Sequence, residues 1–265
     1  MLELKNVKMV FNPATVNEKY ALNSLNMKLN RGDFVTLIGA NGSGKSTVLN
    51  VIAGVYSPQS GSIILDGEDM TRRAEHQRAA HISRVFQDPM LGTASDMQIE
   101  ENLALSRRRG KKRGLKWGIS RAERQLYKEK LGRLKLGLEE RLSVKTGLLS
   151  GGQRQALTLL MATMNTPKLL LLDEHTAALD PATAQKVLEL TDEIINEQHL
   201  TALMVTHNMK DALAYGNRLI MLNEGKILLD IAGEEKKRLS VADLMERFFA
   251  LSGSELAEDG LLLAR

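Results

Sequence analysis

The chain of 265 residues contains no cysteine. Disulfide bridges, cysteine-ligated zinc and thiol catalysis are therefore excluded, although a lack of cysteine does not by itself identify a compartment. No apolar run approaches the ~20 residues that a membrane-spanning helix needs. The first ten residues, MLELKNVKMV, lack the apolar core of a secretory signal. These absences predict a cytoplasmic protein without a membrane span.

The composition is that of a globular protein, with 43% hydrophobic and 26% charged residues. The formal net charge of +4 is unevenly distributed, because residues 107–124 hold nine basic residues and a single acid, Glu123. This segment carries +8 and leaves −4 on the rest of the chain. A solvated loop explains the segment at least as well as contact with anionic headgroups or acidic protein loops, and nucleic acid is the least supported partner.

A strand, a glycine-rich turn and a helix follow one another near the start of the chain. The apolar run Phe34 to Ile38 leads through glycines into Ser46 to Ala53, which has helical spacing. This order opens an α/β nucleotide-binding unit. Two more buried strands, at 169–172 and 202–205, end in polar residues, and ligands of open α/β sheets collect at such ends.

The middle of the chain has a different pattern. From about Met97 to Leu142 the spacing is helical, and Ser120 with Glu123 forms a capping box, which predicts an inserted helical subdomain. The remaining predicted elements are antiparallel strands over 2–11 and 20–29, a helix over 180–196, a hairpin over 219–229 and an amphipathic helix that includes Val241 and Phe248.

Residues 39–47 read GANGSGKST and match the phosphate-binding pattern G-x-x-x-x-G-K-[ST] in its required place between strand and helix. The glycines let backbone N–H groups surround phosphate oxygens, and the helix presents its positive end to them. Lys45 would neutralise the β and γ phosphates, and the Ser46 hydroxyl would ligate Mg²⁺. The predicted nucleotide-binding residues of this motif are Gly39, Ala40, Asn41, Gly42, Ser43, Gly44, Lys45, Ser46 and Thr47.

Two adjacent carboxylates, Asp173 and Glu174, follow the apolar run Leu169 to Leu172. At a strand end both side chains can reach a ligand at the tip. Asp173 suits the coordination shell of Mg²⁺, and Glu174 suits the polarisation of an attacking water. Two surface acids would be a reasonable alternative for this pair alone, but Lys45 in the same chain favours the catalytic interpretation.

Residues 149–153 read LSGGQ, and with this motif the chain resembles the ATP-binding subunits of ABC transporters. A serine and two glycines at the start of a helix can form a second phosphate-binding tip. The resemblance implies a P-loop NTPase with a RecA-like core, an N-terminal antiparallel β subdomain and an inserted α-helical subdomain. It also implies a head-to-tail homodimer with ATP, in which one copy's signature completes the other copy's site. The signature residues are Ser150, Gly151, Gly152 and Gln153.

Further motif positions match the family. Gln87 resembles the glutamine that contacts Mg²⁺ or water, and Asp180 resembles the aspartate of the D-loop at the dimer interface. His207 resembles the switch histidine at the γ-phosphate. Phe11 is the predicted aromatic partner of adenine, with Tyr20 as the alternative.

The sequence departs from the family pattern at a few positions. His175 stands where proline is usual, Ala177 where serine is frequent, and Ala156 where arginine is often found. None of these changes removes a phosphate, metal or water-activating group, so hydrolysis is expected to survive. One hypothesis is that His175 makes the dimer sensitive to pH.

The resemblance covers residues 1–230 as the ATPase domain, with the helical subdomain at about 88–160 and residues 231–265 as a helical extension. It implies an ATPase at the cytoplasmic face of the membrane that drives a separate permease, in an importer with an extracellular solute-binding protein. An amino acid is the solute suggested by analogy. The alternative is a soluble ABC ATPase of a non-transport machine, such as iron–sulfur cluster assembly.

Overall fold

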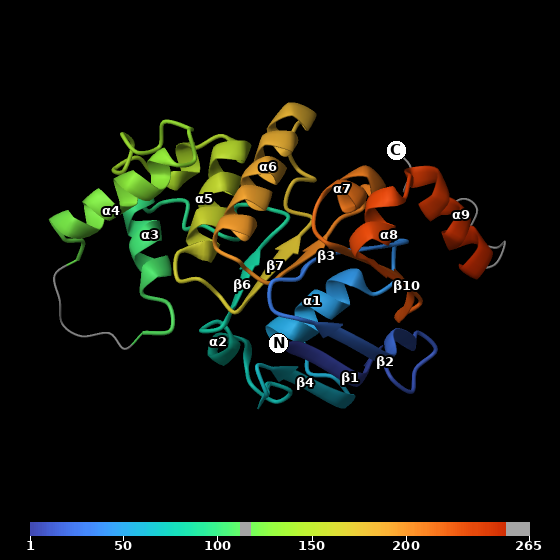
Figure 1. The fold of residues 1–265 in the computed structure, drawn as a ribbon. Coiled ribbons are helices and arrows are strands. Elements are labelled where there is room, and N and C mark those ends of the chain that lie inside the picture. Colours follow the sequence, from blue (N-terminus) through green and yellow to red (C-terminus); the bar gives the residue numbers. More distant parts are fainter. Residues whose placement is uncertain (112–117, 253–265) are drawn as a thin grey trace. The chain divides into compact units, whose positions relative to one another are not determined.

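The computed structural model describes residues 1–111 and 118–252 (Figure 1). The chain divides into two compact units. The first unit consists of Met1–Arg78 and Leu200–Arg265, and the second unit consists of Ala79–His199. The second unit is therefore one continuous segment inserted into the sequence of the first.

The first unit begins with an antiparallel sheet in the order β2-β1-β4-β5 (blue to teal in Figure 1). Its strands are β1 (Leu2–Phe11), β2 (Lys19–Leu29), β4 (Ser60–Leu65) and β5 (Glu68–Asp69). Leu2 pairs with Leu29 on one side and with Leu65 on the other. The predicted antiparallel pair over 2–11 and 20–29 is confirmed, and this sheet is the N-terminal β subdomain of the fold.

The first unit also holds four strands in the order β10-β9-β3-β8. The central strand β3 (Phe34–Gly39) is buried at all six positions and runs parallel to β8 (Ala202–Val205) and β9 (Arg218–Asn223). A continuous apolar run suits this position because both faces of the strand are covered. β10 (Lys226–Ala232) returns antiparallel to β9 and completes the predicted hairpin.

Five helices of the first unit are described: α1 (Lys45–Ala53), α2 (Glu75–Arg78), α7 (Met209–Ala214), α8 (Gly233–Arg238) and α9 (Val241–Ser252). The predicted final amphipathic helix is confirmed, because Leu244 and Phe248 of α9 pack into one cluster with Ile38 of β3. Arg78 is almost fully buried and donates to the carbonyl oxygens of Val51 and Ile52 at 2.8 and 2.9 Å. A cation therefore holds the C-terminal end of α1, where the helix dipole favours positive charge.

The second unit pairs β6 (Ile82–Val85) in parallel with β7 (Leu169–Asp173). Its described helices are α3 (Ile99–Arg107), α4 (Arg121–Gly132), η1 (Thr146–Leu148), α5 (Gly151–Thr163) and α6 (Pro181–Glu197). Ile99, Tyr127, Leu131 and Leu157 belong to one buried cluster of α3, α4 and α5. This cluster is the core of the inserted helical part that the fold class predicts.

The predicted capping box of α4 is confirmed. The Ser120 hydroxyl accepts from the N–H of Glu123 at 3.2 Å, and the Ser120 N–H donates to the Glu123 carboxylate at 2.9 Å. These contacts with Ser120, together with the charges of Arg108 and Arg107, lower the pKa of Glu123 despite partial burial. Glu123 therefore both caps α4 and neutralises part of the basic segment.

Part of the basic segment, residues 112–117, lies outside the described residues. Arg108 pairs with Glu123 at 3.0 Å and Arg124 with Glu100 at 2.7 Å, while Arg109 donates to the carbonyl oxygen of Ala162 at 3.4 Å. These three basic groups are bound within their own unit and resemble structural contacts more than a free anion-binding surface. Over residues 1–111 and 118–252, no helix combines the length and the apolar character needed to cross a membrane.

Candidate functional site

The loop between β3 and α1 approaches neighbouring backbone too closely for side chains. A Cβ on Gly39 would lie 2.3 Å from the carbonyl oxygen of Leu222. One on Gly44, whose φ is +107°, would lie 2.5 Å from the carbonyl oxygen of Ala21. Glycine is therefore required at both ends of the loop, and no side chain covers the backbone at these two positions.

The first turn of α1 has no side-chain cap. Gly44 is the N-cap and provides no side-chain hydrogen bond, whereas α4, α5 and α6 are capped by Ser120, Ser150 and Asp180. Unpaired N–H groups and the positive end of a helix favour an anion. The residues of this loop therefore fit a bound phosphate group.

Lys45 points back across the same loop. The residue is 7% exposed, and its ammonium donates to the carbonyl oxygens of Gly39 at 2.9 Å and Ala40 at 3.0 Å. The Ser43 hydroxyl oxygen is buried and has no hydrogen-bond partner among the described residues. A buried cation and an unused hydroxyl beside the first turn of α1 form a cradle for triphosphate oxygens.

Two aromatic side chains of the first unit contact each other edge to face. The ring of Phe11, at the end of β1, lies 5.4 Å from that of Tyr56 at an angle of 80°. The ring of Tyr20 instead lies under the ammonium of Lys8, with 4.9 Å between Nζ of Lys8 and the ring centroid. The contact with Tyr56 fixes the Phe11 ring, whereas the Tyr20 ring is already engaged by a cation, so Phe11 suits stacking on a base better.

His207 follows β8 and is exposed. The next residue, Asn208, caps α7 by accepting from the N–H groups of Lys210 at 2.8 Å and Asp211 at 3.2 Å. Burial raises the pKa of Asp211, and the charge of His207 partly offsets that rise. The cap fixes the backbone beside His207, while the imidazole is accessible to a ligand.

In the second unit, Asp173 at the end of β7 forms an ion pair with Arg84 of β6, with 2.6 Å between Nη2 and Oδ2. The next residue, Glu174, has a φ of +44°, a left-handed conformation that is uncommon outside glycine. Strained backbone of this kind often occurs at functional sites. Gln87 is exposed and follows β6 by two residues. The pair formed by Asp173 and Arg84 was not predicted, because nothing local in the sequence links the two residues.

The pH-sensor hypothesis for His175 is wrong. Its side chain is 2% exposed and lies 3.0 Å from the Thr191 hydroxyl, which itself donates to the carbonyl oxygen of Val187 at 2.7 Å. Thr191 must therefore accept from the neutral imidazole. Burial lowers the pKa of His175 to about 4, so the ring stays uncharged across the physiological range. His175 anchors the chain after Glu174 onto α6.

The buried imidazole of His175 should make the free energy of unfolding depend on pH. Because the pKa of His175 falls from 6.5 to about 4 on folding, the unfolded chain binds more protons between these values. The free energy of unfolding should therefore be unaffected above pH 6.5 and fall below it, by about 3 kcal/mol at pH 4. Urea unfolding from pH 8 to pH 4 measures this loss. The His175→Gln variant, which keeps a donor but cannot titrate, should lack it; equal pH slopes in both proteins would contradict the assignment.

The signature residues stand at the start of α5. The Ser150 hydroxyl accepts from the N–H of Gln153 at 3.3 Å, and the Ser150 N–H donates to Oε1 of Gln153 at 3.3 Å. A Cβ on Gly152 would lie 2.2 Å from a methyl group of Thr183 on α6. Asp180 caps α6 through the same residue, and its hydrogen bonds to Thr183 lower its pKa. The structure thus brings the signature and Asp180 together within the second unit.

The predicted residues are divided between the units. Phe11, residues 39–47 and His207 belong to the first unit; Gln87, Asp173, Glu174, the signature and Asp180 belong to the second. A cavity of about 570 Å³ in the second unit is lined by Ser150, Gly152 and Gln153 among others. The signature therefore borders a concave surface.

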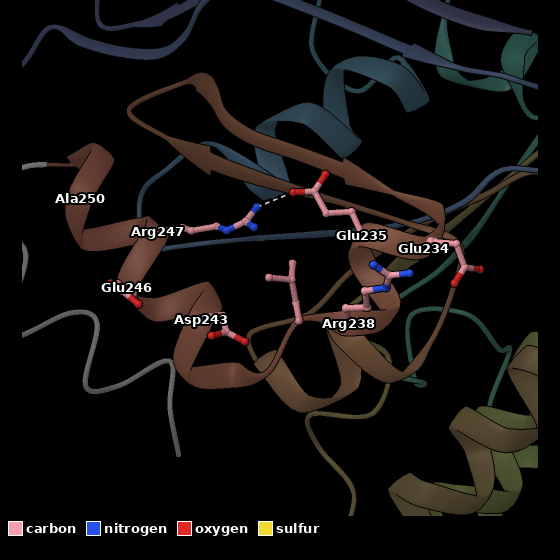
Figure 2. A pocket seen from close by; sticks show the side chains of 8 residues that line it. Glu234, Glu235, Arg238, Asp243, Glu246, Arg247 and Ala250 are labelled. Carbon is pink, nitrogen blue, oxygen red and sulfur yellow. Dashed lines mark hydrogen bonds and ion pairs between the residues drawn. The ribbon is translucent and has the colours of Figure 1, made fainter.

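A further cavity of about 730 Å³ lies between α8 and α9 (Figure 2). None of the predicted site residues lines this cavity. The residues that line it are Glu234, Glu235, Arg238, Leu239, Asp243, Glu246, Arg247 and Ala250. In Figure 2 the side chains of Glu235 and Arg247 point toward each other, and their ion pair measures 2.7 Å. The pair links the two helices of the C-terminal part.

Known proteins and solved structures are similar to this chain over most of its length. The model of the ABC transporter family matches residues 22–177. A tyrosine transport ATP-binding protein of Clostridioides difficile (strain R20291) is 46% identical over 248 residues, covering 94% of this chain and 98% of that protein. A putative hemin import ATP-binding protein of Staphylococcus haemolyticus (strain JCSC1435) is 34% identical, covering 86% of this chain and 99% of that one.

A solved ATP-binding cassette, a dimeric post-hydrolysis state bound to ADP and Pi, is similar with a TM-score of 0.74. Its identity is 30%, and the match covers 88% of this chain and 98% of that chain. The fold, the phosphate loop and these relatives lead to one conclusion: the chain belongs to the ABC transporter family as an ATP-binding subunit and is an ATPase.

Proposed function

We propose that this ATPase drives the uptake of a small solute of the amino-acid class through a separate membrane permease. The observation that carries the solute class is the 46% identity to the tyrosine transport protein over almost the full length of both chains. The uptake direction rests on relatives that are named for import. An extracellular solute-binding protein would deliver the solute to the permease.

The nucleotide would be held by residues 39–47, with Lys45 at the β and γ phosphates and Phe11 at the adenine. Mg²⁺ prefers oxygen ligands, and the exposed hydroxyl of Ser46 and the carboxylate of Asp173 are of this kind. Arg84 binds Oδ2 of Asp173, so Oδ1 is the oxygen suited to the metal. Gln87 would contribute its amide oxygen. When bound, Mg²⁺ would neutralise charge on the phosphates.

Glu174 would accept a proton from the attacking water, and His207 would contact the γ-phosphate. Ser150 and the signature glycines of a second copy would complete the site across a head-to-tail homodimer. Closure of the dimer excludes water from the ATP, and hydrolysis with product release reopens it. The cycle of closing and opening is the motion that a permease can use.

The proposal places the subunit at the cytoplasmic face of the membrane as a peripheral protein. Nucleic acid is not a proposed partner, because Arg108, Arg109 and Arg124 of the basic segment already bind groups of their own unit.

The proposal is tested by affinity purification of the tagged subunit from detergent-solubilised membranes. A hydrophobic permease should co-purify, and the complex in vesicles should show ATP hydrolysis that rises with a loaded solute-binding protein. Tyrosine is the first solute to test, with a sugar as the control. A subunit that stays entirely soluble while its permease candidates are co-expressed would overturn the proposal.

A further inference from the structure

Arg154 lies in the first turn of α5, four residues after Ser150, and its side chain is 8% exposed. Within the described part of the chain, no carboxylate forms an ion pair with it. The position is electrostatically unfavourable, because a cation at the N-terminal end of a helix opposes the helix dipole. A buried guanidinium without a carboxylate needs other hydrogen-bond acceptors.

These acceptors are carbonyl oxygens of the loop before the signature. The Nε of Arg154 donates to Thr146 at 3.2 Å, and Nη2 donates to Gly147 at 2.9 Å and to Leu149 at 3.4 Å. Nη1 faces the sulfur of Met90. Arg154 thus binds the loop 146–149 at three points, immediately before Ser150.

The entry of a chain into a helix is often fixed by an apolar contact between the residue before the N-cap and the fourth helical residue. In α5 these two positions are Leu149 and Arg154. Here the fourth position holds an arginine that donates to the Leu149 carbonyl oxygen instead. The direction in which the chain reaches Ser150 is therefore set by hydrogen bonds.

The opposite side of the loop is held by a buried polar cluster. Thr146 is fully buried, and its hydroxyl donates to the carbonyl oxygen of Ala94 at 2.9 Å. The side chain of Asn102, 1% exposed, accepts from the Ala94 N–H at 2.8 Å and donates to the Gln98 carbonyl oxygen at 3.0 Å. Gly147 donates to the carbonyl oxygen of Ser95 at 2.9 Å. Arg154 is the contact that comes from α5 itself.

We propose that Arg154 is the positioning residue of the signature motif: its clamp on carbonyl oxygens 146, 147 and 149 holds Ser150 and the first N–H groups of α5 in the geometry that binds the partner copy's ATP. This inference rests on the proposed function, in which the signature completes the site of a second copy. The Ser150 oxygen accepts from Gln153, so its own proton is available for a phosphate oxygen. Without the clamp, the loop and that proton lose their fixed direction.

The test uses full-length protein in the Glu174→Gln background, where ATP should hold the dimer. Arg154→Met removes the guanidinium and keeps the length of the side chain. Arg154→Lys keeps the charge but presents a single nitrogen, which cannot span three carbonyl oxygens. Arg109→Met is the matched control, since Arg109 is a half-buried arginine of the second unit that donates to the Ala162 carbonyl oxygen, near the other end of α5. ATP-dependent dimerisation is measured by analytical ultracentrifugation, and ATP binding to the monomer by equilibrium dialysis.

Arg154→Met should raise the dimer dissociation constant at least tenfold while ATP binding to the monomer changes less than twofold. Arg154→Lys should lie between it and the parent, and Arg109→Met should dimerise within threefold of the parent. In otherwise native protein, Arg154→Met should lower kcat more than it raises KM for ATP.

Equal dimerisation of Arg154→Met and the parent would overturn the inference, as would equal losses in the Arg154 and Arg109 variants. If Arg154→Met does not fold, Arg154→Lys decides: parental dimerisation would overturn the inference, and a several-fold weaker dimer with unchanged ATP binding would support it. A parent that fails to dimerise with ATP would instead overturn the proposed function.

Discussion

Glu174→Gln should bind ATP as the native protein does and reduce hydrolysis by roughly 10²- to 10⁴-fold, the usual contribution of a general base. The amide keeps the size of the side chain but does not accept the proton of the attacking water. Glutamine and glutamate differ little in their ability to adopt the φ of +44° found at this position, so the loss of hydrolysis should not come from a changed fold. Phosphate release at saturating Mg²⁺ and ATP measures the loss.

The trapped ATP state should also make the variant dimerise at concentrations where the native protein is monomeric. Glu75→Gln, an exposed glutamate at the start of α2, serves as the control and should turn over normally. Native turnover in Glu174→Gln would refute the role of this carboxylate.

Lys45→Ala should weaken ATP binding about a hundredfold or more, since charge-assisted hydrogen bonds contribute about 1.5–3 kcal/mol each. The ammonium lies inside the phosphate loop, within 3.0 Å of the Gly39 and Ala40 carbonyl oxygens, and would turn from them to the phosphates. Isothermal titration with ATP and Mg²⁺ measures the affinity.

Lys237→Ala is the matched control for charge, because Lys237 is 73% exposed in the same unit and pairs with Glu234. It should bind ATP normally. An unchanged affinity in Lys45→Ala, with the thermal unfolding temperature preserved, would show that the loop does not bind the triphosphate.

The sequence was informative wherever periodicity or a motif was local. The strand over 202–205 and the capping box of Ser120 and Glu123 have the predicted bounds, and β3 was found within one residue. β6 was not predicted, because its four residues include Ser83 and Arg84 and show neither a long apolar run nor a clean alternation. In that strand Arg84 pairs with Asp173, a residue far along the chain.

The same limit explains the error at His175 and the omission of Arg154. Whether a histidine titrates near neutral pH depends on burial, and the burial of His175 is created by Thr191 and the packing of α6. Arg154 follows a recognised motif, and its contacts are with carbonyl oxygens, which every residue possesses. A side chain that binds backbone leaves no partner residue to recognise in the sequence.

The pairing of β3 has a consequence for how the protein is made. Phe34 pairs with Ala202, and Val35 with Arg218, so the strand that leads into the phosphate loop obtains its neighbours only after the whole second unit has been synthesised. Contacts this distant in sequence form late in folding. On the ribosome, the second unit can complete its own core first, and a nascent chain should gain the ability to bind ATP only when its last quarter, from Leu200 onward, has emerged.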